Sequence, residues 1–122
     1  MLAAMARPLI PKHDDAAFIE RLGLLAEESG MPRMAGRVLG WLLISHEPLQ
    51  SFGEIVDGLG ASKGSISSMS RLLVQLGLIE RVTQPGDRRD FFRLHPDAWT
   101  RFLRQRVEMI RRFRDLAAEA IR

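Results

Sequence analysis

Serine, lysine and arginine side chains gather in two neighbouring stretches of this chain. Five serines lie within residues 62–70, beside Lys63 and Arg71, in a segment that ends at Gly77. The second stretch, Pro85-Gly-Asp-Arg-Arg89, places two arginines in a short turn. Hydroxyl groups can hydrogen-bond to base edges, and guanidinium groups bind phosphate. Because a helix fits the major groove and an arginine on a turn can enter the minor groove, both stretches have the chemistry to hold duplex DNA.

The serine-rich segment is predicted to be a helix with one polar face. Ser62 is a suitable N-cap, because a serine oxygen can accept a hydrogen bond from the first turn. Serine is a mediocre helix former, so helix propensity does not explain so many serines. Gly64 leaves room for close approach to a sugar–phosphate strand, and Lys63 can meet a phosphate. The alternative for this helix taken alone is a solvated polar face. The residues predicted to contact DNA here are Ser62, Lys63, Gly64, Ser65, Ser67, Ser68 and Arg71.

The basic turn is predicted to be the tip of a hairpin that grips the minor groove. Asp87 can accept hydrogen bonds from turn amides or from Arg89, and these bonds would stiffen the tip. Arg88 or Arg89 then projects outward, and a held arginine loses less entropy on binding than a free one. A simple charged hairpin is the alternative. Three further arginines, Arg71, Arg81 and Arg93, are predicted to be phosphate neighbours.

Two helices are predicted before the serine-rich segment. Residues 14–29 begin with two aspartates, which suit the positive N-terminal end of a helix, and Gly30 can end it. The second helix begins near Pro32 and contains the apolar run 38–44, so it should be the central one. His46-Glu-Pro48 ends this second helix. The apolar stripe of the first helix consists of Phe18, Ile19, Leu22, Leu25 and Ala26.

A helix–turn–helix and a hairpin are predicted to carry the two polar stretches. Ser51-Phe-Gly-Glu54 matches a capping box, in which serine and glutamate satisfy each other's free N–H groups. A short helix follows as far as Gly58 to Gly60, and the serine-rich helix comes next. Residues 78–83 and 90–94 have the pattern of strands around the basic turn. Two short helices across a glycine-containing turn are typical of DNA-binding proteins, in which the second helix meets base edges.

The last predicted helix starts at Pro96 and carries two apolar stripes. From Trp99 to Ala120, residues of one stripe recur at spacings of three and four, interrupted only by Arg106. We therefore predict that this helix is buried both on its own domain and on a second chain, with the first helix also contributing. Packing on its own core alone is the alternative. The predicted dimer contacts are Trp99, Phe102, Leu103, Met109, Ile110, Phe113, Leu116 and Ala120.

The fold class expected from this order is mostly α with a small β-hairpin. We predict a winged helix-turn-helix with N- and C-terminal dimerisation helices. Residues 1–13 are expected to form an N-terminal arm, residues 14–95 the DNA-binding domain, and residues 96–122 the C-terminal dimerisation helix. The chain of 122 residues is long enough for one domain with a helical extension.

Charge is unevenly distributed along the chain. Residues 1–60 hold 5 Lys/Arg and 8 Asp/Glu, a balance of −3, whereas residues 61–122 hold 13 and 7, a balance of +6. A basic half that begins at the serine-rich segment suits a polyanionic partner, although a solvated charged surface is the alternative. The chain has no cysteine and no apolar run long enough to span a bilayer. We therefore expect a cytoplasmic protein without membrane association.

No pattern of catalytic or metal-ligating residues stands out. His13, His46 and His95 lie in three separate segments, without the spacing of a metal site. The glycines Gly58, Gly60 and Gly64 do not form a phosphate loop, because no Gly-Lys-Ser/Thr ending follows. We expect neither enzymatic activity nor a metal or cofactor.

The hairpin segment Gly86-Asp-Arg-Arg-Asp-Phe-Phe-Arg-Leu94 resembles the wing signature of MarR-type winged-helix regulators, in which an Asp-x-Arg pair sits at the tip. Residues 60–68, together with 71–73 and 76–81, are similar to the GbsR-like branch of this family. So is the segment from Gly30 to Trp41. The resemblance covers roughly residues 14–122, and the last helix is short for that branch.

This resemblance implies a homodimeric transcriptional regulator, usually a repressor, bound to a pseudo-palindromic operator. It implies a minor-groove role for Arg89 and a bracing role for Asp87. It also implies base or backbone contacts for the polar residues of the serine-rich helix, which are Ser62, Lys63, Ser65, Ser67 and Ser68. Similarity to this branch also implies osmolyte-related regulation.

Two other functions remain open. A winged helix can serve protein contact instead of DNA binding, although such a surface would favour apolar residues over serine and arginine. Alternatively, a small-molecule effector could bind between the dimer helices and the winged domain and release the DNA. Phe18, Met34, Trp41 and Trp99 could line such a pocket, but each is also a reasonable core residue.

Overall fold

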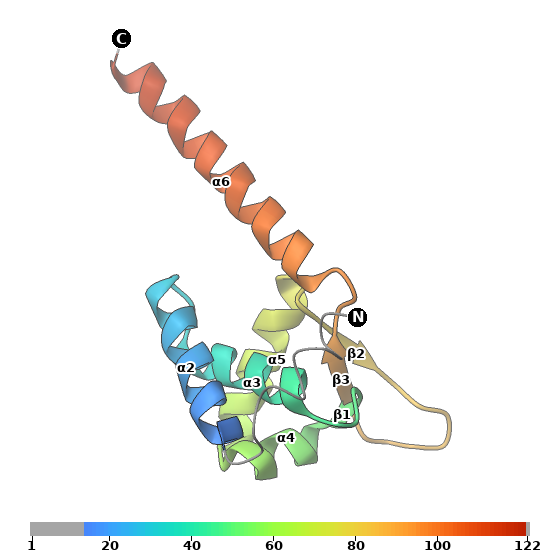
Figure 1. Ribbon diagram of the computed structural model, residues 1–122. Helices are drawn as coiled ribbons and strands as arrows, with labels where there is room; N and C mark the ends of the chain where they lie inside the picture. Colours follow the sequence, from blue (N-terminus) through green and yellow to red (C-terminus); the bar gives the residue numbers. More distant parts are fainter. Residues whose placement is uncertain (1–13, 122) are drawn as a thin grey trace.

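The computed structural model describes residues 14–121, which form a helical body, a small sheet and one long projecting helix (Figure 1). The predicted N-terminal arm, residues 1–13 with His13, lies outside the described residues, as does Arg122. In chain order the elements are α2 (Asp15–Glu28), α3 (Arg33–Ile44), β1 (Gln50–Ser51), α4 (Phe52–Leu59), α5 (Lys63–Gln75), β2 (Ile79–Val82), β3 (Phe91–Leu94) and α6 (Ala98–Ile121). This architecture confirms the predicted winged-helix fold class.

The sheet has one strand more than the predicted hairpin. Its order is β1-β3-β2, with both pairs antiparallel, and β1 places Gln50 and Ser51 opposite Phe92 and Phe91. The backbone N–H of Phe52 also donates to the carbonyl of Asp90, at 2.9 Å. A strand of two residues has no alternating pattern, so the sequence carries no signal for it. β1 ties the start of the helix–turn–helix directly to the hairpin.

The core lies between α3, α5 and the sheet. Its fully buried side chains come from every layer of the body, and α3 lies at the centre as predicted. Trp41 is partly buried, and its indole Nε1 donates to Oε1 of the buried Gln50 at 3.0 Å. The largest fully buried side chains are Val38, Ile55, Ile66, Leu73, Leu78 and Ile79.

Helices α2 and α3 pack closely through glycine. A Cβ added to Gly36 would lie 2.5 Å from the carbonyl oxygen of Leu22 and 2.7 Å from the Cα of Gly23. This close approach turns Ile19, Gly23 and Ala26 toward α3. Leu25 was expected in the buried stripe, but it is 59% exposed because the contact centres on Gly23 instead.

The helix–turn–helix has the caps that its sequence predicts. Ser51 Oγ accepts the Glu54 N–H while a Glu54 carboxylate oxygen accepts the Ser51 N–H, each at 3.1 Å, which completes the capping box. Gly60, at φ +60°, provides the left-handed turn between α4 and α5, a conformation that glycine adopts without a Cβ clash. The two helices are thereby fixed at the angle that exposes the start of α5.

Helix α6 leaves the body after its first turns and extends away from it (Figure 1). Ala98 is buried and Phe102 is half-buried against the core, but beyond Arg106 the residues as far as Ile121 are exposed. The guanidinium of Arg106 donates to the carbonyl of Ser29 at 2.6 Å and lies over the ring of Phe102. Among the described helices, none is both long and apolar enough to cross a membrane.

Candidate nucleic-acid interface

The start of α5 presents a polar surface to solvent. Ser62 Oγ accepts the N–H of Ser65 at 3.1 Å, which caps the helix as predicted. Lys63, Gly64 and Ser68 are exposed. Ser65 is half-buried. The surface therefore combines short side chains with one lysine, and the backbone lies close to the molecular surface.

Ser67, Ser70 and Arg71 follow further along α5. Ser67 and Arg71 line a cleft of about 350 Å³ between α5 and the sheet. Phe52, Arg81 and Phe92 form the opposite wall. Ser70 is buried and therefore does not belong to the polar face. The predicted contacts Ser62, Lys63, Gly64, Ser65 and Ser68 lie on the first turns of α5, and Ser67 and Arg71 line the adjoining cleft.

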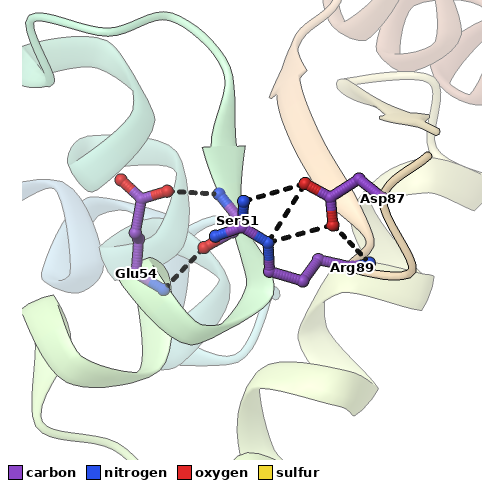
Figure 2. A network of polar contacts seen from close by, with 4 residues as sticks. All are labelled: Ser51, Glu54, Asp87 and Arg89. Carbon is purple, nitrogen blue, oxygen red and sulfur yellow. Dashed lines mark hydrogen bonds and ion pairs between the residues drawn. The ribbon is translucent and has the colours of Figure 1, made fainter. Parts of the chain in front are cut away.

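Asp87 and Arg89 form a closed contact at the turn between β2 and β3. The Asp87 carboxylate accepts the backbone N–H of Arg89 at 2.9 Å, and it also accepts Nη2 of the same residue at 2.8 Å (Figure 2). Gly86, at φ +78°, allows the chain to reverse just before this pair. The brace predicted from the Asp-x-Arg spacing is thus present in the folded chain.

The same contact changes how the two side chains titrate. Side-chain and then backbone hydrogen bonds from Arg89 lower the pKa of the Asp87 carboxyl to about 2. The carboxylate in turn raises the pKa of Arg89. The pair therefore keeps both charges, and the contact keeps its geometry, at every pH near neutrality.

Arg89 is held at two points and remains accessible. Its guanidinium carbon lies 5.0 Å from the centroid of the Phe91 ring, a cation–π distance, while 64% of the side chain is exposed. The sequence predicted that Arg88 or Arg89 projects outward, and both side chains are exposed, with Arg89 also lying between a carboxylate and a ring. Arg88, its neighbour, is exposed.

Two arginines of the sheet are paired with carboxylates. Arg81 lies 3.4 Å from Asp90, and Arg93 lies 2.9 Å from Glu80. The hydrogen bond from Arg93 lowers the pKa of Glu80. These pairs reduce the net positive charge that the strands present, and at least half of each arginine side chain remains exposed.

The predicted dimer residues form an exposed apolar face on α6. Ile110 is 66% exposed and Phe113 is 71% exposed, although both are large and apolar. Phe102 is the exception, because it packs against the core of its own chain. Exposed apolar residues that the sequence analysis did not assign to the dimer contact are Val107 of α6 and Leu24 of α2. The adjacent leucines Leu24 and Leu25 are the feature of the sequence that could have indicated an exposed apolar surface on α2.

An apolar pocket of about 280 Å³ lies between α2, α3 and the start of α6. Its walls include Leu22, Leu25, Leu39, Trp99 and Phe102. Of the four residues predicted to line such a pocket, only Trp99 does so. Phe18, Met34 and Trp41 lie elsewhere, because the pocket is built around the end of α2 rather than its start.

His46 and His95, which lie within the described part of the chain, belong to no metal-binding group. Within residues 14–121, no group of three His, Cys, Asp or Glu side chains could hold a metal ion. His95 accepts the Asp97 N–H through Nδ1 at 3.0 Å, and its Nε2 lies 3.4 Å from Glu80. It therefore connects the end of β3 to the start of α6.

Residues 29–90, which run from the end of α2 to the hairpin turn, match the sequence profile of the MarR family. The chain belongs to the MarR family. The match spans the helix–turn–helix and the Asp87–Arg89 brace, but it stops before β3 and α6.

Comparison with individual MarR-family relatives agrees with this assignment. The chain is 41% identical over 109 residues to the HTH-type transcriptional regulator MmpR5 of Mycobacterium tuberculosis (strain ATCC 25618 / H37Rv), covering 89% of this chain and 66% of that protein. A crystal structure of a transcriptional regulator superposes with a TM-score of 0.75 at 41% identity, over 88% of this chain and 74% of that one. The MepR–DNA complex of S. aureus has a TM-score of 0.56 at 17% identity, over 85% and 77% of the two chains, and shares the fold.

Proposed function

We propose that this chain is a sequence-specific, double-stranded DNA-binding transcriptional regulator. The observation that carries the proposal is the Asp87–Arg89 brace, which holds an accessible cation at the tip of the hairpin. The start of α5, in the helix–turn–helix, supplies exposed hydroxyls and Lys63. A narrow minor groove attracts a guanidinium, and a major groove admits a helix.

The relatives support this proposal. MmpR5 carries the description of a transcriptional regulator, and a similar structure at 41% identity carries the same description. A more distant chain of the same fold was solved in complex with DNA. This chain spans only 66% of the length of MmpR5. The proposed activity therefore rests on the surface of this chain as well as on its relatives.

A role in protein contact without DNA is less well supported. Exposed large apolar side chains in the described part of the chain lie on α2, α6 and the C-terminal part of α5. The start of α5 and the hairpin turn present serine, lysine and arginine instead. A surface of that kind fits a polyanion better than an apolar protein partner.

We further propose that the protein acts as a homodimer on a pseudo-palindromic operator and represses transcription in the cytoplasm. The exposed apolar face of α6, with Leu24 and Leu25 of α2, would be covered by a second copy. Residues 14–95 would then form the DNA-binding domain and residues 96–122 the dimerisation helix. Two recognition helices in one dimer bind adjacent turns of the duplex together.

The finer placement in the GbsR-like branch is also a proposal. It rests on residues 30–41, 60–68, 71–73 and 76–81 of the sequence. Reporter expression in the presence of changing osmolyte concentration would test it, and a response to osmolyte would support the branch assignment.

A small-molecule effector is a second candidate function, favoured by the apolar pocket beside Trp99. The pocket lies between the body and the root of α6, so an apolar ligand there could change the angle of the helix. Such a ligand should raise the thermal midpoint of the purified protein and weaken its binding to DNA. An apolar compound that binds without changing DNA affinity would contradict this function.

The proposed function is tested by selecting bound sequences from random duplex DNA with the purified protein. An inverted repeat with half-sites about one helical turn apart is the expected result, because a symmetric dimer presents two equal surfaces. A pool that remains random after several rounds would contradict sequence-specific binding. Recovery of a single, unrepeated site would contradict the dimer alone.

A further inference from the structure

Gly64 has no structural reason within its own chain to be glycine. It is the second residue of α5, with exposed backbone, and its φ is not positive. A Cβ added to Gly64 would meet nothing within 4 Å. By contrast, a Cβ on Gly36 would strike the backbone of α2, and one on Gly58 would strike the ring of Trp41.

A glycine at such a position weakens the helix that contains it. Glycine loses more backbone entropy on folding than alanine does, and alanine is the better helix former. Since alanine would fit at residue 64 without any rearrangement, the free chain would be more stable with it. The missing side chain therefore gives the free chain no stability, and a benefit to function would have to come from a partner that approaches the helix.

The residues around Gly64 would allow the surface of a partner molecule to approach the helix closely. Ser68, one turn further along α5, is also exposed and carries only a hydroxyl. Ser62 Oγ already accepts the Ser65 N–H, so its remaining hydrogen is free to donate to an acceptor such as a phosphate oxygen. Lys63 adds a positive charge next to the glycine. No bulky side chain separates this part of the backbone from solvent.

We propose that Gly64 is a specificity-determining residue that sets how deeply α5 enters the major groove. This inference rests on the proposed DNA-binding function. The Cα of Gly64 lies against the DNA in the complex, and this contact brings Ser65 and Ser68 within hydrogen-bond distance of base edges. A serine side chain is too short to reach a base from a helix held further out.

The test is the substitution Gly64→Ala, measured both for thermal stability and for affinity to the selected operator. The thermal midpoint should rise by a few degrees, because alanine favours the helix. Affinity for the operator should fall by about tenfold or more, because the added methyl overlaps the DNA and lifts the helix. Affinity for random duplex DNA, which depends mainly on phosphate contacts, should change much less.

Gly53→Ala is the matched control. Gly53 is the second residue of α4, is exposed, and would also carry a Cβ with nothing within 4 Å. Its substitution should raise stability without the loss of operator affinity. Unchanged operator affinity in Gly64→Ala, or an equal loss in both variants, would overturn the proposal while leaving DNA binding intact. A wild-type protein that binds no duplex would overturn the proposed function, and this inference with it.

Discussion

A single carboxylate organises the residue that we propose enters the minor groove. Asp87 binds both the backbone and the guanidinium of Arg89, and the ring of Phe91 lies beneath that guanidinium. A free arginine has many rotamers, and each immobilised long side chain costs about 0.5–1.5 kcal/mol on binding. The brace therefore lowers the entropy loss of DNA binding before any DNA is present.

Replacing Asp87 by alanine distinguishes the bracing of Arg89 from the electrostatic effect of the Asp87 charge on DNA binding. Removal of a negative charge near DNA should tighten binding if electrostatics alone mattered. We predict instead that Asp87→Ala weakens operator binding by about 0.5–1.5 kcal/mol, because Arg89 is no longer held. Asp90→Ala, which removes the same charge without touching the brace, is the control. Fluorescence anisotropy titrations measure both, and tighter binding by Asp87→Ala would contradict the account.

The brace also predicts a pH dependence at the turn. Asp87 has a folded-state pKa of about 2, below its ordinary value of 3.8. A depressed carboxyl pKa contributes stability that is fully present above the ordinary value and is lost as pH falls toward 2. In an NMR pH titration, the Asp87 carboxyl should have its midpoint near 2, and Arg89→Ala should return it toward 3.8. The brace is absent in solution if the wild-type midpoint already lies near 3.8.

Several residue-level features could be predicted from the sequence, and others required the fold. The Asp87–Arg89 contact spans two residues, so its spacing is visible in the sequence. The position of Arg89 over Phe91 depends on where β3 begins, and the sequence does not specify that residue. Ser67 is half-buried on the wall of the cleft, and this position depends on how the sheet packs beside α5, which the sequence does not show.

At the scale of the elements, caps and apolar spacing were the strong signals. The capping box at Ser51 and the left-handed glycines Gly60 and Gly77 mark helix ends that the structure places within a residue or two. The short strand β1 was missed, because two residues carry no period. Leu25 was misplaced because helix packing in this chain follows glycines rather than the widest apolar stripe.

Close packing of α2 on α3 gives a prediction for Gly36. A methyl group there would meet the backbone of α2, which cannot move as a flexible side chain does. We expect Gly36→Ala to lower the free energy of unfolding by about 1–3 kcal/mol. Gly53→Ala, at a position where a Cβ has room, should instead raise the free energy of unfolding by about 0.5–1 kcal/mol. Urea denaturation compares the two variants, and equal stability would show that the helices are further apart than described.

For the whole molecule, the polar surface of α5 and the hairpin is distinct from the apolar face of α6. The helix–turn–helix and hairpin carry the proposed DNA surface, while α6 extends away from the body with its apolar side chains exposed (Figure 1). The spacing of apolar residues in the sequence predicted the apolar face of α6. The sequence did not show that Phe102 packs against the core of its own chain. Both stripes consist of apolar residues at helical spacing, so only the folded position of the first turns of α6 distinguishes them.

A charge on the apolar face of α6 should separate the proposed dimer. We predict that Ile110→Asp shifts the sedimenting species from dimer to monomer at micromolar concentration and weakens operator binding. Arg112→Ala is the control, since Arg112 lies on the opposite face by helical spacing and is 79% exposed at its side chain. A wild-type protein that sediments as a monomer would contradict the dimer, as would an Ile110→Asp variant that remains dimeric.

The most direct measurement of the central claim is the affinity of the purified protein for its selected duplex as a function of salt. Counterion release predicts a linear fall of log K with log salt, by at least about tenfold between about 50 and 200 mM. Arg89→Ala should weaken binding by about 1–3 kcal/mol. Binding that is independent of salt, or unchanged by loss of Arg89, would contradict the claim that this basic surface holds duplex DNA.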